Sequence, residues 1–521
     1  MPAGNGGCRS ADGPSATHCP RKGRIGKEAS PFGHGLEVGG RAVRAPAGPA
    51  SKNGIIETMD TKGTSGKLRE VVHEVDLCVA GGGVAGVTAA LQAARAGART
   101  VLMEMGSQVG GTLSSGGVNW PGLFHAWGRQ IIAGCGWDLV AEAVALSGGT
   151  MPDFSRDVLP RHWLHQVRVS VPVWVALAEE KLAAAGVRLL YHAAPVSARA
   201  VESGWRLRIA LGGKLAFLDA AVLVDATGNG ALAALCGARR MRDEASRQPG
   251  SFAFLIDPHA ESTALDIASI ERNRTEAIAD GRLLPADMRN GVKAFVDEAN
   301  FFVRARASEP EAGLPLANYV ADADNTTAES RAATNMAGRA MALRVLRFLR
   351  AQPGLERATL VATASEVGVR ETWRVEGDYV ITGRDYVSGR RFRDAVCYAF
   401  YPVDLHDAAT GIHPKQLAPD VVPTVPLRAL CAKGVPRLLV AGRCVSSDRA
   451  ANSGLRVQAA CMATGQAAGE AAALAAASGL DPRDVPLGEL RRRLAASGHI
   501  VPVLSRCAKL KGSSVNQGVN P

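Results

Sequence analysis

Several features that define other protein classes are missing from this sequence. Its ten cysteines are scattered singly, without a C-x-x-C pair or a metal-ligand spacing, which indicates reduced thiols and no metal site. No uncharged apolar run reaches the about eighteen residues that cross a bilayer, and no apolar signal segment stands at the N-terminus. No stripe of Lys and Arg with interleaved aromatic residues is present. We therefore expect a cytoplasmic protein without membrane insertion, metal ion or nucleic-acid partner.

Glycine and positive charge, by contrast, are abundant. The chain has 58 glycines among 521 residues, a content that suits tight packing of helices on a sheet. The net charge is +11, and residues 1–72, with 11 basic and 6 acidic side chains, contribute +5 of it. Because this segment has no apolar periodicity, we predict a disordered basic tail over 1–72. Translation from Met59 is one hypothesis for it, and a targeting peptide is the less favoured alternative.

A strand-helix-strand unit is predicted directly after the tail. The apolar run "VDLCVAGGG" indicates a strand, an alanine-rich stretch indicates a helix, and "ARTVLMEM" indicates a second strand. Between the first strand and the helix, Gly81, Gly83 and Gly86 form the pattern G-x-G-x-x-G. Its glycines permit a tight turn, expose backbone amides to a pyrophosphate and let helix and strand approach closely. Val84 and Ala85 complete this predicted dinucleotide-binding loop.

A carboxylate stands where such a site needs one. Glu104 ends the second strand eighteen positions after Gly86. There it would accept both hydroxyls of an adenosine ribose and repel a 2′-phosphate. The sequence therefore predicts a dinucleotide without that phosphate.

The rest of the chain reads as an alternation of helices and strands that returns to the first domain. We predict a helix at 172–185, a strand at 187–191 and two short strands between 205 and 226. The region 240–435 is mixed, with an arginine-rich helix near 331–350 and strand-like alternation in "GVRETWRVEGDYVITGRDYVSG". A strand at 437–442 and a helix at 456–477 follow.

Three segments carry a resemblance to a known family. These are "VDLCVAGGGVAGVTAALQAARAGARTVLMEMGSQVGGTLSSGGVNWPG", "VLVDATGNG" and "RLLVAGRCVSSDRAANSGLRVQAACMATGQAAGEAA". Together they resemble FAD-dependent oxidoreductases related to fumarate reductase flavoproteins, over about residues 74–478. Relatives with covalent FAD use a histidine just after the equivalent glycine loop, where this chain reads "SSGGVNWPG". The resemblance therefore implies non-covalent FAD, unless His125 substitutes.

The resemblance also implies an α/β fold and a division of the chain. We expect a discontinuous, Rossmann-like FAD-binding domain of the glutathione-reductase type with an inserted α+β substrate or cap domain. The expected boundaries are 73–240 for the first part of the FAD domain, 241–435 for the substrate domain, 436–480 for the second part of the FAD domain, and 481–521 for a C-terminal helix and tail.

Further cofactor contacts follow from the resemblance. It places the loop "QVGGT" beside the pyrophosphate and the flavin, and the backbone after "VRLLYH" near the adenine. It places the strand end "DATG" near the diphosphate and the "GR" segment with Arg443 at the ribityl chain. A helix that starts near Arg456 would aim its N-terminal amides at the flavin pyrimidine edge. The implied contacts are Gly110, Gly111, Thr112, Val196, Asp225, Gly228, Gly442, Asp448, Leu455, Arg456 and Val457.

Two groups of polar residues are candidates for the reaction itself. His125 and Arg129 would share one face if "WPGLFHAWGRQ" is helical, although both could simply pack beside Trp120 and Trp127. In the expected substrate domain, Arg370 suits a carboxylate and His406 suits proton transfer, with Tyr401 and Asp404 beside the latter. Internal ion pairs with Glu366 or Asp404 are the structural alternatives.

The leading hypothesis is a flavin-dependent oxidoreductase that acts on a small, polar and possibly anionic metabolite, with an unassigned electron acceptor. An FAD monooxygenase or a double-bond reductase on a larger substrate is a second interpretation. A flavin-binding redox sensor or assembly protein without turnover is a third. The sequence does not indicate an oligomeric state.

Overall fold

The computed structural model describes residues 72–155, 162–243, 247–257, 259, 265–288, 316–320, 323–407 and 411–503. The predicted tail lies outside these residues except for its last position, and so do Met59 and the end of the C-terminal tail. All described residues belong to one compact unit of the chain, which begins at Leu68.

The first elements form the predicted strand-helix-strand unit. Strand β1 (Val72–Ala80), helix α1 (Val84–Arg95) and strand β2 (Thr100–Met103) follow one another, and β1 and β2 are parallel neighbours. Leu77 and Cys78 are adjacent on β1 and face different hydrophobic clusters, and both are fully buried. Burial on both faces is typical of a parallel strand covered on each side.

This unit is the centre of a seven-stranded sheet. Its order is β5 (Arg188–Leu190), β2, β1, β8 (Lys214–Asp225), β7 (Gly204–Leu211) and β6 (Ala193–Val201), with β18 (Leu438–Val440) also paired to β8. β5, β2, β1, β8 and β18 are parallel, whereas β6, β7 and β8 form an antiparallel meander. The mixed α/β fold with a parallel sheet is thus confirmed, and the chain returns to this sheet at β18.

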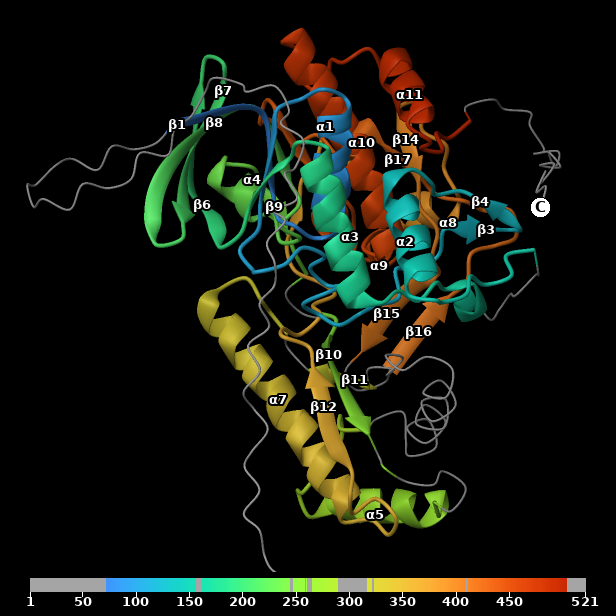
Figure 1. Ribbon diagram of the computed structural model, residues 1–521. Coiled ribbons are helices and arrows are strands. Elements are labelled where there is room, and N and C mark those ends of the chain that lie inside the picture. Colours follow the sequence, from blue (N-terminus) through green and yellow to red (C-terminus); the bar gives the residue numbers. More distant parts are fainter. Residues whose placement is uncertain are drawn as a thin grey trace, which may run out of the picture. The chain divides into compact units, whose positions relative to one another are not determined.

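One face of the sheet is covered by α1 and the long helix α10 (Gln458–Ser478), which lie side by side (Figure 1). Their contact is made by small residues, because a Cβ on Gly465 or Gly469 would overlap the carbonyl oxygens of Ala85 and Ala89. Thr88 Oγ1 donates a hydrogen bond to the Met462 carbonyl across the same contact, at 3.0 Å. Helices α2 (Cys135–Leu146) and α3 (Val171–Ala184) also pack on α1.

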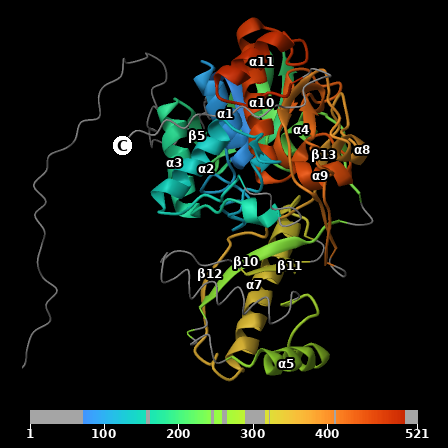
Figure 2. The same ribbon diagram turned by 90° about the vertical axis from the view of Figure 1, so that its right-hand side faces the viewer.

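A second region has its own hydrophobic core. Strand β10 (Gly250–Asp257) pairs antiparallel with β11 (Leu316–Val320) and β12 (Thr359–Thr363), and helix α7 (Ala328–Arg350) packs on them (Figure 2). Gly338 allows this packing, since a Cβ there would come within 2.6 Å of the Phe252 ring. Helix α5 (Ile267–Ala279) completes this α+β region.

The remaining elements are short. They are β3 (His125–Ala126), β4 (Arg129–Gln130), η1 (His162–His165), α4 (Ala231–Leu235), β9 (Arg240–Met241), β13 (Arg374–Val375), α8 (Gly383–Val387), β14 (Ala395–Tyr398), β15 (Val403–Asp407), β16 (Gly411–Lys415), β17 (Thr424–Pro426), η2 (Leu427–Ala429), η3 (Gly442–Cys444), α9 (Arg449–Leu455) and α11 (Leu487–Ala496). The pairs β9–β13, β14–β17, β15–β16 and β3–β4 are two-stranded and antiparallel.

Residues of the expected substrate domain contribute to more than one hydrophobic core, and the expected domain boundaries stay a prediction. The core of the β10–α7 region draws its residues from 252–369, whereas Tyr386, Val396 and Val425 join the core around α1 and α10. The strand-like alternation predicted after Gly368 is observed only at β13, because the following residues form turns and the short helix α8. Much of the expected substrate domain therefore packs against the dinucleotide-binding core.

Among the described helices, none combines the length and apolar character needed to cross a bilayer. The cysteines of the described ranges are all free, and no three His, Cys, Asp or Glu side chains in those ranges gather as metal ligands would.

Candidate functional site

The glycine loop is closely packed at Gly81 and Gly86 and open at Gly83. Gly81 has a φ of +98°, and a Cβ there would lie 2.5 Å from the Ala226 carbonyl oxygen. A Cβ on Gly86 would overlap the carbonyl oxygen of Gly81. Gly83 is different: it is the N-cap of α1, a Cβ there meets nothing within 4 Å, and no side chain caps the helix. Val84 and Ala85 follow in the first helical turn, so its amides are open to an anion.

Glu104 is held against this loop by backbone donors. Its Oε2 accepts a hydrogen bond from Gly82 N at 2.6 Å, and its Oε1 accepts one from Gly106 N at 2.7 Å. Each carboxylate oxygen has a second lone-pair position for a further donor. The carboxylate is therefore fixed at the end of β2 beside the loop, and its bond to a ribose stays a prediction.

The predicted loop at Gly110 lies against Gly83. Gly110 N donates to Gly82 O at 2.7 Å, and Gly83 and Gly110 form an isolated parallel bridge. A Cβ on Gly111 would lie 3.1 Å from the Gly83 Cα, and the Thr112 carbonyl accepts a hydrogen bond from Val118 N. The structure thus brings the loop that the resemblance placed at Gly110 against the glycine loop that the G-x-G-x-x-G pattern predicted.

Asp225 organises the loop after β8. Its fully buried carboxylate accepts hydrogen bonds from Thr227 N (2.9 Å), Thr227 Oγ1 (2.6 Å) and Ala233 N (2.7 Å). Burial raises the pKa of Asp225, although these donors oppose the shift. The next glycine, Gly228, has a φ of +75° and directs its carbonyl to Thr372 Oγ1 and Arg443 Nε. The Asp225 side chain therefore shapes this loop, and its proximity to FAD stays a prediction.

The segment after β18 is tied to its surroundings at three residues. A Cβ on Gly442 would lie 2.8 Å from the Ala85 Cβ, which brings the segment onto α1. Arg443 donates to the carbonyls of Gly228 and Val369. The Asp448 carboxylate caps α9 through Ala451 N at 2.8 Å and accepts Gly383 N at 2.7 Å. Asp448 thus has a local capping function, and its contact with the ribityl chain stays a prediction.

The junction between α9 and α10 lies at the start of the long C-terminal helix predicted from about Arg456. Leu455 ends α9, Arg456 follows it, and Val457 is the N-cap of α10, which begins at Gln458. A Cβ on Gly122 would overlap the Val457 side chain, so the end of the segment "VNWPG" lies directly against this junction. No side chain caps α10, but its second amide is already used, because Ala459 N donates to the Pro121 carbonyl at 2.8 Å. A contact of this helix end with the flavin stays a prediction.

Val196 lies elsewhere in the fold. It belongs to β6 in the meander, and 47% of its surface is exposed. The backbone before it is close to Glu104, because Ala193 N donates to the Glu104 carbonyl. Its contact with an adenine stays a prediction.

His125 and Arg129 do not share one face, because the helix on which that arrangement depended is not formed. These residues lie on a two-stranded hairpin in which Trp127 and Gly128 have φ values of 52° and 70°, as a tight type I′ turn requires. His125 pairs with Gln130 and Arg129 with Ala126, so the two side chains point to opposite faces. The His125 ring stacks on Phe154 at 3.8 Å, and burial lowers its pKa to about 4. His125 therefore packs beside aromatic rings, as the alternative held, but these rings are Phe154 and Trp137 in place of the expected Trp120 and Trp127.

The other candidates come together near the start of α10. His406 Nε2 and Asp404 Oδ2 are 2.8 Å apart, and Arg456 Nη2 donates to the same Oδ2 at 3.3 Å and to the Asp404 carbonyl at 3.1 Å. Arg370 acts electrostatically on Asp404 and donates from Nη1 to the Pro249 carbonyl at 2.8 Å. We call Arg370, Asp404, His406 and Arg456 the β15 cluster.

The charges of the β15 cluster follow from its burial and pairing. Burial opposes ionisation of Asp404, but the hydrogen bond with His406 and the positive charges of Arg456 and Arg370 outweigh it and lower the pKa of Asp404 to about 2. Burial lowers the pKa of His406 to about 4, despite the bond to Asp404. At neutral pH Asp404 is therefore ionised and His406 is neutral.

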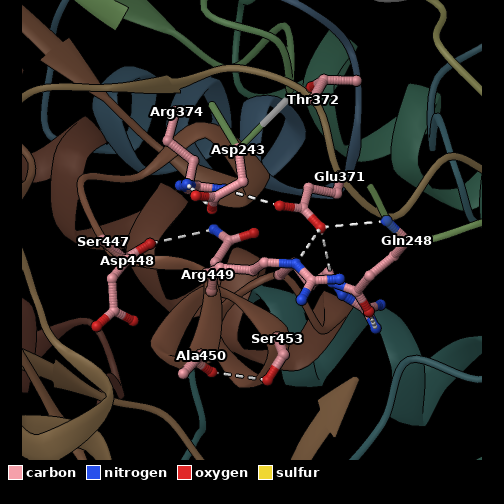
Figure 3. A network of polar contacts seen from close by, with 12 residues as sticks. Asp243, Gln248, Glu371, Thr372, Arg374, Ser447, Asp448, Arg449, Ala450 and Ser453 are labelled. Atoms are coloured by element: carbon pink, nitrogen blue, oxygen red, sulfur yellow. Dashed lines mark hydrogen bonds and ion pairs between the residues drawn. The ribbon is translucent and has the colours of Figure 1, made fainter. Parts of the chain in front are cut away.

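A second buried network lies beside the cluster and was not foreseen from the sequence (Figure 3). Glu371, 1% exposed, accepts hydrogen bonds from Arg374 Nη1 at 3.2 Å and Arg449 Nε at 3.1 Å. Gln248 N and Nε2 donate to the same carboxylate at 3.3 and 3.2 Å. Arg374 also pairs with Asp243, whose side chain is 50% exposed. Only the position of Glu371 next to Arg370 in "GVRETWR" hinted at it.

Tyr401 is a further residue of this region. Its ring packs edge-on against His162, and its hydroxyl oxygen accepts a hydrogen bond from Gln166 Nε2 at 2.8 Å. Burial, together with the charge of Asp404, raises the pKa of Tyr401 to about 12. Tyr401 is therefore a neutral hydrogen-bonding group beside the β15 cluster.

Together, the parallel sheet, the open glycine loop at α1 and the acidic residue after β2 define an α/β dinucleotide-binding protein. Residues 76–494 match the family model described as FAD dependent oxidoreductase, and the chain belongs to that family. It is an FAD-dependent oxidoreductase.

Comparison with known proteins adds likenesses of fold. No curated protein sequence matches the chain. A geranylgeranyl bacteriochlorophyll reductase-like protein from Thermoplasma acidophilum is 11% identical, with 82% of this chain and 83% of that chain covered and a TM-score of 0.38. A p-nitrophenol 4-monooxygenase from Pseudomonas putida is 11% identical, with coverages of 79% and 82% and a TM-score of 0.37. A glycine oxidase from Geobacillus kaustophilus is 18% identical, with coverages of 35% and 62% and a TM-score of 0.26.

Proposed function

We propose that the chain binds FAD non-covalently, with the pyrophosphate at the N-terminus of α1 and the flavin near the start of α10, and that it oxidises or reduces a small anionic metabolite at the β15 cluster. The observation that carries this proposal is that a guanidinium and an imidazole share one carboxylate as their hydrogen-bonding partner. Arg456, one residue before the N-cap of α10, and His406 both bind Asp404. A cation and a proton-transfer group are thereby held together where the flavin is expected.

The glycine loops support the cofactor part of the proposal. The Cβ position of Gly83 is clear of protein atoms, while Gly81 and Gly86 have no room for a side chain. This combination leaves space for a ligand at the helix N-terminus and rigid packing on both sides of it. FAD would supply the electron transfer, and the residues of the chain would supply position, charge and proton transfer.

The charge balance supports an anionic substrate. Four guanidinium groups, those of Arg370, Arg374, Arg449 and Arg456, lie around the buried carboxylates of Glu371 and Asp404. Two further carboxylates lie nearby: Asp243 is half exposed, and Asp448 accepts hydrogen bonds from the backbone amides of Gly383 and Ala451. Positive charge that the two buried carboxylates leave unbalanced would be stabilised by an anion, and the planar guanidinium matches a carboxylate.

The β15 cluster also defines how a proton would move. Ionised Asp404 can only accept, so His406 Nε2 carries the proton in their hydrogen bond and Nδ1 is the basic atom. Proton uptake at Nδ1 would create an imidazolium that Asp404 stabilises, and release from Nδ1 would serve the reverse reaction. The relation to fumarate reductase flavoproteins is also a proposal, supported by the three sequence segments alone.

Spectral titration of the purified holoprotein tests this function. Small mono- and dicarboxylates should perturb the visible spectrum of bound FAD, and Arg456→Met should weaken their binding about tenfold or more, because a charged hydrogen bond is lost. Arg492→Met is the matched control, since this exposed arginine on α11 pairs only with Glu489 among the described residues. Folded protein that stays colourless with excess FAD, or equal carboxylate binding by Arg456→Met and the native protein, would refute the proposal.

A further inference from the structure

Gln248 connects the two polar networks of the site. It lies just before β10, and only 1% of its surface is exposed. On one side its backbone N and its Nε2 donate to Glu371 Oε2, at 3.3 and 3.2 Å. On the other side its Oε1 accepts hydrogen bonds from His406 N at 3.1 Å and from Arg456 Nη2 at 3.5 Å.

The orientation of the Gln248 amide is determined by its partners. A carboxylate can only accept hydrogen bonds, so the amide NH₂ must face Glu371. The amide oxygen then faces the opposite way, toward the backbone of β15 and the guanidinium of Arg456. A flipped amide would set its oxygen against a carboxylate oxygen and its NH₂ against two donors, which burial makes costly.

Glu371 is itself held rigidly. Arg374 and Arg449 approach its two carboxylate oxygens, and Figure 3 shows Glu371 between these side chains and Gln248. Arg449 begins α9, the helix that ends directly before Arg456. The Glu371 carboxylate therefore binds Arg449 at the start of α9 and also binds the Gln248 amide. That amide in turn contacts Arg456, which follows the end of α9.

We infer that Gln248 is a positioning residue: oriented by Glu371, it holds the Arg456 guanidinium and the β15 backbone at His406 in one register, so that the positive charge of Arg456 stays beside the flavin. This inference rests on the proposed function. Gln248, a loop residue far in sequence from any cofactor motif, would thus control the position of a positive charge beside the flavin.

Sulfite titration of FAD-loaded protein tests the inference without a known substrate. Sulfite adds reversibly to oxidised flavins and bleaches them, and positive charge near the pyrimidine ring favours the addition. We expect Arg456→Met to weaken sulfite binding about a hundredfold and Gln248→Met about tenfold. In the double variant the two effects should not add, because both act through the same guanidinium.

A matched control and a second variant complete the design. Gln352→Met makes the same change at a buried glutamine whose amide bonds only to Asn273 and Phe348 among the described residues, and it should leave sulfite binding unchanged. Gln248→Asn keeps a buried polar group but is one methylene too short to join both networks, so it should weaken sulfite binding as Gln248→Met does. Thermal unfolding verifies that each variant is folded.

The outcomes separate this inference from the proposed function. If Arg456→Met leaves sulfite binding unchanged, Arg456 does not act on the flavin and the proposed function fails with it. If Arg456→Met weakens binding while Gln248→Met and Gln248→Asn both bind sulfite as the native protein does, the proposed function stands and the inference is overturned. Additive effects in the double variant would likewise overturn it.

Discussion

Gly465 on α10 lies directly on the carbonyl oxygen of Ala85 on α1, with no space for a Cβ between them. Ala85 is in the first turn of the helix that follows the glycine loop, and Gly465 is in the helix that follows Arg456 and Val457. Together with the contact of Gly469 on Ala89, this contact holds the helix of the expected pyrophosphate end close to the helix of the expected flavin end.

Replacing Gly465 should separate the two helices. Gly465→Leu would force a branched side chain into backbone and should reduce the free energy of unfolding by about 3 kcal/mol or more. Urea unfolding followed by circular dichroism measures the change. Gly488→Leu, at an exposed helical position with no neighbour within 4 Å, is the control and should cost less than about 1 kcal/mol. Equal stability of the two variants would contradict the close contact.

Replacing Gly83 should affect the cofactor and spare the fold. Gly83→Val places its side chain where no protein atom lies within 4 Å, and we expect folded protein that has lost FAD. Gly86→Val should instead yield little folded protein, since its Cβ overlaps the Gly81 carbonyl. The ratio of FAD to protein and the thermal unfolding curve distinguish the two effects. A fully yellow Gly83→Val protein would show that the pyrophosphate binds elsewhere.

FAD retention should depend on how many acceptor oxygens the side chain at position 104 keeps. Glu104→Ala removes the acceptors of Gly82 N and Gly106 N and should weaken FAD retention, with a loss of stability of about 2 kcal/mol. Glu104→Gln keeps one acceptor oxygen and should fall between the native protein and Glu104→Ala. Equilibrium dialysis against FAD gives the order of affinities. An order in which Glu104→Ala binds FAD as tightly as the native protein would exclude a ribose contact.

Acidification below the ordinary pKa of histidine should destabilise the protein. Burial lowers the pKa of His499 and of His406 to about 4, below the histidine value of 6.5. In this pH range the unfolded chain binds more protons than the native state, so stability is full above pH 6.5 and falls as the pH approaches about 4. Each such histidine contributes up to about 1.4 kcal/mol per pH unit.

Urea unfolding at about pH 7 and about pH 5 measures this dependence. His499, fully enclosed and hydrogen-bonded to the Val396 carbonyl, is remote from the β15 cluster in sequence and contacts. His499→Gln should therefore reduce the loss of stability between the two pH values without abolishing it. A variant with the same pH dependence as the native protein would show that His499 does not titrate in this range.

The dinucleotide-binding part of the fold was predictable because its signals are local. The strand-helix-strand unit, the three glycines and Glu104 lie within a few turns of chain, and the structure has β1, α1 and β2 where the apolar periodicity indicates them. The helices α3 and α7 and the strand β18 also match predicted segments. In each case the hydrophobic pattern and the element have the same period.

The candidate site was predictable only in part. Asp404 was named as an alternative ion-pair partner, and the structure has it paired with His406. The bond of Arg456 to Asp404 and the link through Gln248 were not foreseen, because they depend on contacts between distant segments. His125 and Arg129 had the spacing of a helical face, yet Trp127 and Gly128 turn the backbone into a hairpin there. Turn chemistry overrode the spacing, and an isolated segment does not reveal which one prevails.

The sequence by itself determined the class of this protein, because the glycine loop and each family segment are continuous stretches of chain. The chemistry of each depends on few residues. Only the tertiary structure decided which polar side chains share a site, because Glu371 and Asp404 are buried carboxylates whose partners must come from other segments to offset the loss of water. Their choice of partners depends on how β15, α9 and the loop before β10 pack together, and no local pattern encodes that packing.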